Sequence, residues 1–304
     1  LFHSLHDGLL ALPSETELWP GHLGGSLCGG PGMDMKTSST IGYELEHNPV
    51  LGIGDEGEFV DRVTLDLPPQ PANFHRIVDI NRGPFVTPDD EPEHIDLDEL
   101  DERVSRGALV IDPRDSVDFD AGHIPGALSN PARQGGFANR LAWLADPEAE
   151  IVLLADSAAA GQHLALLVAS VGIGSRPALA IDATAAWGES GRSLTTIRRE
   201  PADALADLRS LRPDLAILDV RERSEWEAGR IEDAVHRPYH ELGDGIPELD
   251  PSRPVAVICA SGQRAGVAAS VLARAGFTEP IHIVDGGVGQ AVAASPDLAG
   301  VGDV

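Results

Sequence analysis

The last two thirds of the chain carry the same sequence pattern twice. The order and spacing of the matching residues stay constant, so a segment of about a hundred residues is duplicated, which is the size of a domain rather than of a solenoid repeat. The matching pairs are 109–114 (LVIDPR) with 216–221 (AILDVR), 121–127 (AGHIPGA) with 228–234 (AGRIEDA), and Asn130-Pro131 with Arg237-Pro238. The chain therefore contains two domains of one fold, which we place at 93–192 and 193–304.

Each copy alternates short apolar runs with segments of helical periodicity. In the second copy, residues 215–220, 255–258 and 281–284 are the apolar runs, and 222–227 and 266–275 are the helical ones. Apolar strands separated by helices are typical of a parallel sheet that is covered on both faces. The fold class predicted for both copies is a three-layer α/β domain with a parallel sheet.

Cys259 begins the most distinctive segment of the second copy, where a predicted strand passes into a predicted helix. Ligands bind at the carboxyl ends of the strands in such sheets. There, free backbone N–H groups and the helix dipole stabilise a thiolate, and an arginine adds positive charge. Small residues let the backbone curl around the sulfur. We therefore predict that Cys259 is a nucleophile, with a binding loop of Ala260, Ser261, Gly262, Gln263 and Arg264.

These segments resemble the rhodanese (sulfurtransferase) family over nearly all of 215–291. The resemblance is carried by 219–222 (DVRE), Glu225, the loop 259–264 (CASGQR) and 285–287 (DGG). It implies that Cys259 passes a sulfane sulfur as a persulfide, from a donor such as thiosulfate or a low-molecular-weight persulfide to a thiol acceptor, without a cofactor. Arg230 and Ala291 depart from the family's usual His and Trp, both away from the loop.

Two other interpretations remain open for the cysteine loop. A cysteine phosphatase of rhodanese-like fold needs a loop one residue longer than the four residues between Cys259 and Arg264, so the narrower ring suits a single sulfur atom better. Single cysteines are also often inert core residues, and the tandem copies would then form a non-catalytic scaffold or a docking module for sulfur relay.

The first copy resembles the same family but lacks its chemistry. Its corresponding loop, 155–160 (ADSAAA), contains neither cysteine nor arginine, and Asp156 would repel an anionic donor. We expect this copy to be structural or to serve in docking. His123, in a Gly-His-Ile context, is interpreted as a structural hydrogen-bonding residue.

The segments 19–29 (WPGHLGGSLCG), 39–44 (STIGYE), 74–76 (FHR) and 81–84 (NRGP) resemble the persulfide dioxygenase and glyoxalase-II-like branch that is fused to rhodanese domains. The resemblance implies that residues 1–57 are the C-terminal piece of a metallo-β-lactamase αββα fold, and the many prolines of 58–92 predict an extended connector after it. The resemblance also implies a protein of sulfide and glutathione-persulfide metabolism. A metallo-hydrolase of glyoxalase-II type is the alternative for the intact protein.

The same resemblance makes His22 a ligand of Fe(II) or Zn in the intact domain. Neutral imidazole binds such metals well. The family's His-x-His-x-Asp-His cluster does not occur in this sequence, so we expect no tightly held metal in this chain by itself. Cys28 is expected to pack rather than to react. Because the chain opens with Leu1 inside a helical pattern, we expect a processed or excised N-terminus.

The formal net charge of −27, from 49 acidic and 22 basic residues, argues against nucleic acid and anionic membranes as partners. No apolar run reaches the roughly 18–20 residues that span a bilayer. Two cysteines in 304 residues indicate reduced thiols and a cytoplasmic protein. A homodimer is possible.

Overall fold

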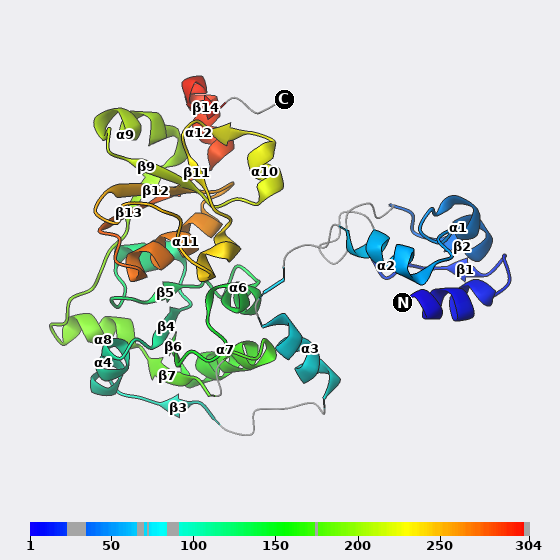
Figure 1. Ribbon diagram of the computed structural model, residues 1–304. Coiled ribbons are helices and arrows are strands. Elements are labelled where there is room, and N and C mark those ends of the chain that lie inside the picture. Colours follow the sequence, from blue (N-terminus) through cyan, green and yellow to red (C-terminus); the bar gives the residue numbers. More distant parts are fainter. Residues whose placement is uncertain (23–34, 66–69, 72, 84–90, 174–175, 301–304) are drawn as a thin grey trace. The chain divides into compact units, whose positions relative to one another are not determined.

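The computed structural model describes residues 1–22, 35–65, 70–71, 73–83, 91–173 and 176–300. The chain divides into two compact units, Leu1–Gln70 and Pro71–Val304 (Figure 1). No helix in these described ranges is long and apolar enough to cross a membrane.

The first unit is small and built from short elements. Its core includes the fully buried Ile41 and Phe59, and the ring of Phe59 meets that of Phe2 at 5.4 Å between centroids. The helical start of the chain ends before Pro13, as expected from the missing N–H of proline. The elements are η1 (Ser4–Gly8), η2 (Leu9–Ala11), β1 (Glu17–Leu18), antiparallel to β2 (Ser39–Thr40), α1 (Ile41–His47) and α2 (Glu56–Thr64).

The prediction of an extended connector at 58–92 is wrong in part, because this region contains helical segments. Helix α2 reaches into it, and α3 (Phe74–Arg82) forms within it. The prolines of this region flank α3 and leave its interior free of them, so nothing interrupts its hydrogen bonds. The Asn73 side-chain amide donates to the Val171 carbonyl, and Ile77 packs into the core of the first copy. Helix α3 therefore belongs to the second unit.

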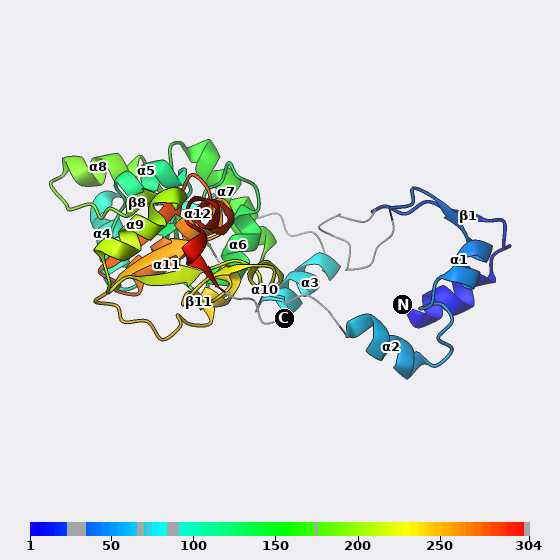
Figure 2. The same cartoon turned by 90° about the horizontal axis from the view of Figure 1, so that it is seen from above.

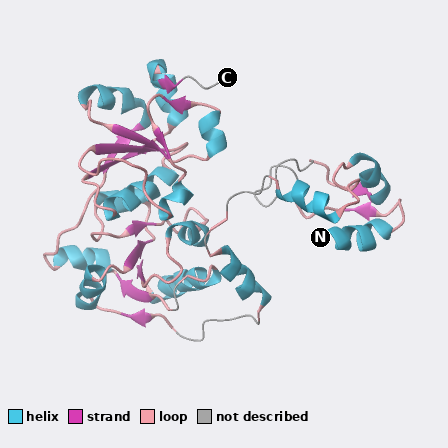
Figure 3. Cartoon of the chain, in the orientation of Figure 1, coloured by secondary structure: helices cyan, strands magenta, loops and turns pink. Residues whose placement is uncertain are grey.

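The second unit contains two five-stranded sheets of the same topology (Figure 3). Their orders, β5-β4-β6-β7-β3 and β11-β9-β12-β13-β8, correspond strand for strand, and every neighbouring pair is parallel. The predicted duplication and parallel sheets are confirmed. The first copy comprises β3 (Glu93–His94), α4 (Leu97–Ser105), β4 (Leu109–Asp112), α5 (Ser116–Ala121), β5 (Leu128–Ser129), α6 (Phe137–Leu144), β6 (Ile151–Ala155), α7 (Ala158–Ser170), β7 (Ala178–Ile181) and α8 (Ala183–Glu189).

The second copy follows the same plan with small additions, including an antiparallel pair of β10 with β14. Its elements are β8 (Arg198–Pro201), η3 (Ala202–Ala204), α9 (Leu205–Leu211), β9 (Ala216–Asp219), α10 (Arg223–Glu227), β10 (Arg230–Ile231), β11 (Val235–His236), η4 (Tyr239–Gly243), β12 (Pro254–Ile258), α11 (Gln263–Arg274), β13 (Glu279–Val284), α12 (Val288–Ala294), η5 (Pro296–Leu298) and β14 (Ala299–Gly300).

The two copies share one hydrophobic core. Successive side chains of a strand point to opposite faces of its sheet. In β6, Val152 and Leu154 enter the same core as Val255 and Val257 of β12, while the alternate residues of each strand enter a separate core of their own copy. One face of each sheet therefore contributes side chains to a core that the two copies have in common.

Helix α11 is the main element between the two sheets (Figure 1), and Figure 2 shows the same helix from above. It packs against β12 and β13 of its own copy and against β5 and α5 of the first copy. Its Ser270, which is fully buried, accepts a hydrogen bond from the Ser129 amide (3.0 Å). At its C-terminal end, Arg274 donates to the carbonyls of Gly107 and Gly126. The helix that follows the cysteine loop is thus fastened to the first copy.

Candidate active site

Cys259 follows the last residue of β12, the middle strand of its sheet. It belongs to the shared core with Val255 and Val257, and its residue is 1% exposed. Its thiol forms no disulfide with any described residue. Ala260 and Ser261, the next two residues, are exposed. The sulfur thus lies just inside the surface, beneath the turn that follows it.

Gly262 brings its backbone amide to the sulfur. Its N–H donates to Cys259 Sγ at 3.1 Å, and its φ of +90° is a left-handed conformation that glycine adopts without strain. Helix α11 begins at the next residue, so Gln263 and Arg264 lie in its first turn rather than in a loop. The positive end of that helix is directed toward the turn that holds Cys259. Among the predicted binding residues, Gly262 is therefore the one whose amide is seen to donate a hydrogen bond to the sulfur.

The Asp-Gly-Gly segment at 285–287 and the residue after it lie against the backbone of the cysteine loop. The Val288 amide donates to the Cys259 carbonyl at 3.0 Å. A Cβ on Gly287 would lie 2.1 Å from that carbonyl oxygen and 2.4 Å from the Ala260 carbonyl carbon. Only glycine allows the two backbones to come this close.

Arg264 is held by Glu225 of α10 in a two-pronged ion pair with N···O distances of 2.6 and 2.8 Å. The hydrogen bonds from Arg264 hold the pKa of the Glu225 carboxyl below its ordinary value. The hydrogen-bonded Glu225 in turn raises the pKa of Arg264, and the negative charge of a Cys259 thiolate adds to this. The arginine thus remains positively charged near the sulfur while its guanidinium is oriented by a carboxylate.

The lowered pKa of Glu225 predicts a pH-dependent contribution to stability. Glu225→Gln removes the charge of the pair, so at neutral pH the variant should unfold at a lower temperature than the wild type. As the pH falls below the ordinary glutamate value of 4.5 and through the lowered pKa of the folded state, wild-type Glu225 takes up a proton and the difference should vanish. Thermal unfolding of both proteins from neutral pH to about pH 3 checks this. A difference that stays constant over that range would contradict it.

The Asp-x-Arg motif that both copies share is structural. In the second copy Asp219 is fully buried and its carboxylate accepts from the Arg221 guanidinium, which also donates to the Gly229 carbonyl at 2.8 Å. Asp112 and Arg114 repeat this arrangement in the first copy. The motif fixes the end of one strand to the following helix in each copy and does not touch the cysteine.

The first copy has no equivalent of the sulfur. In the register of the two sheets Leu153 corresponds to Val257, so Ala155 occupies the place of Cys259. From this position the connection to the following helix, 156–157, is one residue shorter than the connection 260–262 in the second copy. A cavity of about 520 Å³ opens there, and its charged lining is mainly acidic: Asp112, Asp115, Asp118, Asp156 and Asp182, against Arg114 and Arg133. Such a lining disfavours an anionic sulfur donor.

Three residues near the loop were missed as site residues by the sequence interpretation: Gly287, Glu225 in its role as partner of Arg264, and His282. His282 interrupts the apolar run of β13, and its neighbours Ile281 and Ile283 are fully buried on the other face. A single polar residue in a buried strand was the available signal.

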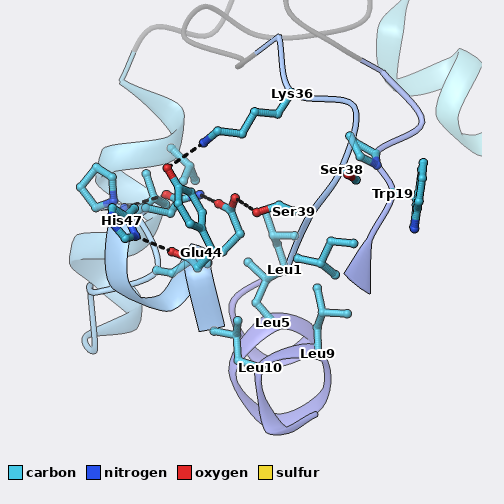
Figure 4. Close-up of a pocket in the computed structure, with 18 of the residues that line it drawn as sticks. Leu1, Leu5, Leu9, Leu10, Trp19, Lys36, Ser38, Ser39, Glu44 and His47 are labelled. Atoms are coloured by element: carbon cyan, nitrogen blue, oxygen red, sulfur yellow. Dashed lines mark hydrogen bonds between the residues drawn. The ribbon is translucent and has the colours of Figure 1, made fainter. Parts of the chain in front are cut away.

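His22 lies at the edge of the first unit and is exposed. It lines a cavity of about 790 Å³ in which Leu5, Leu9 and Leu10 face Glu44 and His47 (Figure 4). Among the residues that the structure describes, no group of three or more His, Cys, Asp or Glu is placed so that it could hold a metal ion. Cys28 lies outside the described residues.

A duplicated parallel α/β fold with a cysteine at the carboxyl end of a middle strand defines the class of this protein. The chain belongs to the rhodanese-like domain family, whose model matches residues 96–183 and 201–294. These two segments cover more than half of the chain and agree with the two copies.

Curated relatives carry sulfurtransferase names. The thiosulfate sulfurtransferase GlpE of Pseudomonas syringae pv. syringae is 33% identical over 94 residues, which are 31% of this chain and 86% of that protein. The probable adenylyltransferase/sulfurtransferase MoeZ of Mycobacterium tuberculosis is 30% identical over 112 residues, covering 36% of this chain and 28% of MoeZ. Together with the family, they support sulfur transfer as the chemistry of this chain at the level of the family.

A metallo-beta-lactamase from Staphylococcus aureus is among the similar solved structures. It is 22% identical, with a TM-score of 0.40, over 59% of this chain and 49% of that chain. A score of this size does not establish a fold, so the metallo-β-lactamase origin of residues 1–57 stays a prediction.

Proposed function

We propose that the chain is a sulfurtransferase that carries sulfane sulfur as a persulfide on Cys259. The Cys259 thiolate attacks the outer sulfur of a donor such as thiosulfate or a low-molecular-weight persulfide. A new S–S bond forms, the S–S bond of the donor breaks, and sulfite or a thiolate leaves with the electron pair. A thiol or cyanide then attacks the outer sulfur and releases the Cys259 thiolate. Such a two-step covalent reaction follows ping-pong kinetics.

The observation that carries this proposal is the hydrogen bond from the Gly262 amide to Cys259 Sγ, at the N-terminus of α11. A backbone donor and the positive end of a helix can both stabilise negative charge on a reacting sulfur, and the paired Arg264 adds a permanent positive charge. Because the cysteine is 1% exposed, a donor must present a slender terminal sulfur to reach it, which thiosulfate and small persulfides do. The cycle needs no cofactor.

The competing function is a scaffold without chemistry, and mass spectrometry separates the two. After exposure to thiosulfate or glutathione persulfide, the intact protein should gain the mass of one sulfur atom, and peptide mapping should place it on Cys259. Cyanide should then remove it and yield thiocyanate. An unmodified Cys259 under these conditions would favour the scaffold.

We place this sulfurtransferase in a metallo-β-lactamase/rhodanese fusion of sulfide and glutathione-persulfide metabolism, in the cytoplasm. The support is the sequence resemblance of residues 1–57, including His22 as a family ligand of Fe(II) or Zn. The gene region that precedes the codon for Leu1 tests this context. The family's histidine-rich metal motif in that region would support the fusion, and a different domain there would exclude it.

A further inference from the structure

The two copies meet at a buried contact between ionisable groups. His282 of β13 is 1% exposed and Asp120 of α5 is 2% exposed. The His282 Nδ1 and Asp120 Oδ2 atoms are 2.7 Å apart. Burying such a pair is costly unless it is fully hydrogen-bonded, so its presence in the shared interface calls for a role.

The other ring nitrogen of the same histidine reaches the cysteine loop. His282 Nε2 donates to the Gly262 carbonyl at 2.8 Å, and the Gly262 amide donates to Cys259 Sγ at 3.1 Å. A continuous chain of contacts thus runs from Asp120 through His282 and Gly262 to the sulfur. It crosses from the copy without cysteine to the copy with it.

The hydrogen bonds define how the histidine is held. A carbonyl oxygen only accepts, so Nε2 carries a proton, and the hydrogen bond between Nδ1 and Asp120 Oδ2 requires one further proton between those two atoms. The Arg199 guanidinium of β8 lies 3.7 Å from the same carboxylate oxygen, and His123 is a further electrostatic neighbour of Asp120. With both ring nitrogens bonded, the imidazole has a single orientation.

The first copy provides an internal comparison. In the register of its sheet Leu179 occupies the place of His282, and each packs against a helical glycine, Gly161 and Gly266 respectively. The site accommodates an apolar side chain in the copy that lacks the cysteine. The histidine accompanies the sulfur, which favours a role at the site over a general need of the fold.

We propose that Asp120 and His282 are positioning residues for Cys259, so that the cysteine-less copy completes the sulfurtransferase site of the other. Asp120 orients His282, and His282 holds the Gly262 carbonyl so that the Gly262 amide points at the sulfur. This inference rests on the proposed function for its purpose, but the positioning itself is measurable on the thiol alone.

The test uses the full chain carrying Cys28→Ser, so that Cys259 is the single thiol. His282→Leu, which introduces the residue type found at this position in the first copy, should slow alkylation of Cys259 by iodoacetamide about tenfold, which corresponds to the free energy of one buried hydrogen bond. Asp120→Ala, which leaves the histidine in place but unoriented, should slow it about threefold. Asp120→Asn should stay near the wild-type rate, because its amide can donate to Nδ1 while Nε2 still donates to Gly262. The kcat/KM for thiosulfate should follow the same order.

Ser270→Ala is the matched control, because it removes a buried hydrogen bond between the copies on α11 without reaching the loop. It should leave alkylation unchanged, with circular dichroism confirming that every variant is folded. Folded His282→Leu and Asp120→Ala proteins that react like the wild type would overturn the proposal. So would an Asp120→Asn or Ser270→Ala protein as slow as Asp120→Ala. If the wild type makes no thiocyanate while the alkylation series holds, the positioning stands and the proposed function fails.

Discussion

Cys259→Ser is expected to abolish the formation of thiocyanate from thiosulfate and cyanide, by about a thousandfold or more. A hydroxyl at this position is not ionised at neutral pH and cannot hold a second sulfur, so the covalent intermediate is lost. The substitution changes one atom in a buried place beneath the Gly262 amide, and the thermal midpoint should move by only a few degrees. Steady-state assays and unfolding curves of the purified variant check both expectations.

Cys28→Ser is the matched control for the loss of a thiol and should retain full activity. Thiocyanate production by Cys259→Ser at the wild-type rate would show that the sulfur is carried elsewhere. A loss of activity in both variants would point to a role for Cys28 and contradict the single-cysteine mechanism.

Gly287→Ala should have the second largest effect, on activity and stability together. Its Cβ would lie 2.1 Å from the Cys259 carbonyl oxygen and 2.5 Å from that of Ala260, and both are backbone atoms that cannot rotate away. The cysteine loop and the start of α12 must therefore separate, at a cost of about 1–3 kcal/mol or more. Moving the loop also misplaces the Gly262 amide, so the rate of persulfide formation should fall at least about tenfold. Denaturant unfolding and single-turnover assays measure the two losses.

Gly289→Ala, two residues further along, separates this steric effect from a general intolerance of α12. No heavy atom lies within 4 Å of its added Cβ, and the residue is exposed in the helix. Alanine is the better helix former by about 0.5–1 kcal/mol, so this variant should be fully active and as stable as the wild type or more so. An active, stable Gly287→Ala protein would contradict the close approach of the two backbones.

The sheets could be predicted because their signals are local. Buried parallel strands such as 255–258 are continuously apolar, and the repetition of the Asp-x-Arg strand end marks the two copies. The helices within 58–92 were not predicted because the large number of prolines there was taken to indicate an extended chain. Their positions matter more, since they flank Phe74–Arg82 without entering it.

The candidate site could be predicted only where its residues are neighbours in sequence. The loop from Cys259 to Arg264 could be recognised because it combines a thiol, small residues and a cation within six consecutive residues. The partners of that loop, Glu225, His282 and Asp120, come from three other elements and meet it only after the sheets have packed. No spacing rule connects residues 120 and 282, so their encounter was outside the reach of pattern reasoning. The catalytic roles of the loop residues stay predictions.

The common core of the two copies has a consequence for how the chain can be divided. The first copy has Ala155 at the position of Cys259, yet it supplies apolar side chains to the core that both copies share. Side chains such as Val152 and Leu154 belong to the same buried cluster as Val255 and Val257. Separating the two copies would therefore expose apolar surface of the cysteine-bearing copy to water, so we expect that copy to be less stable alone than within the whole chain.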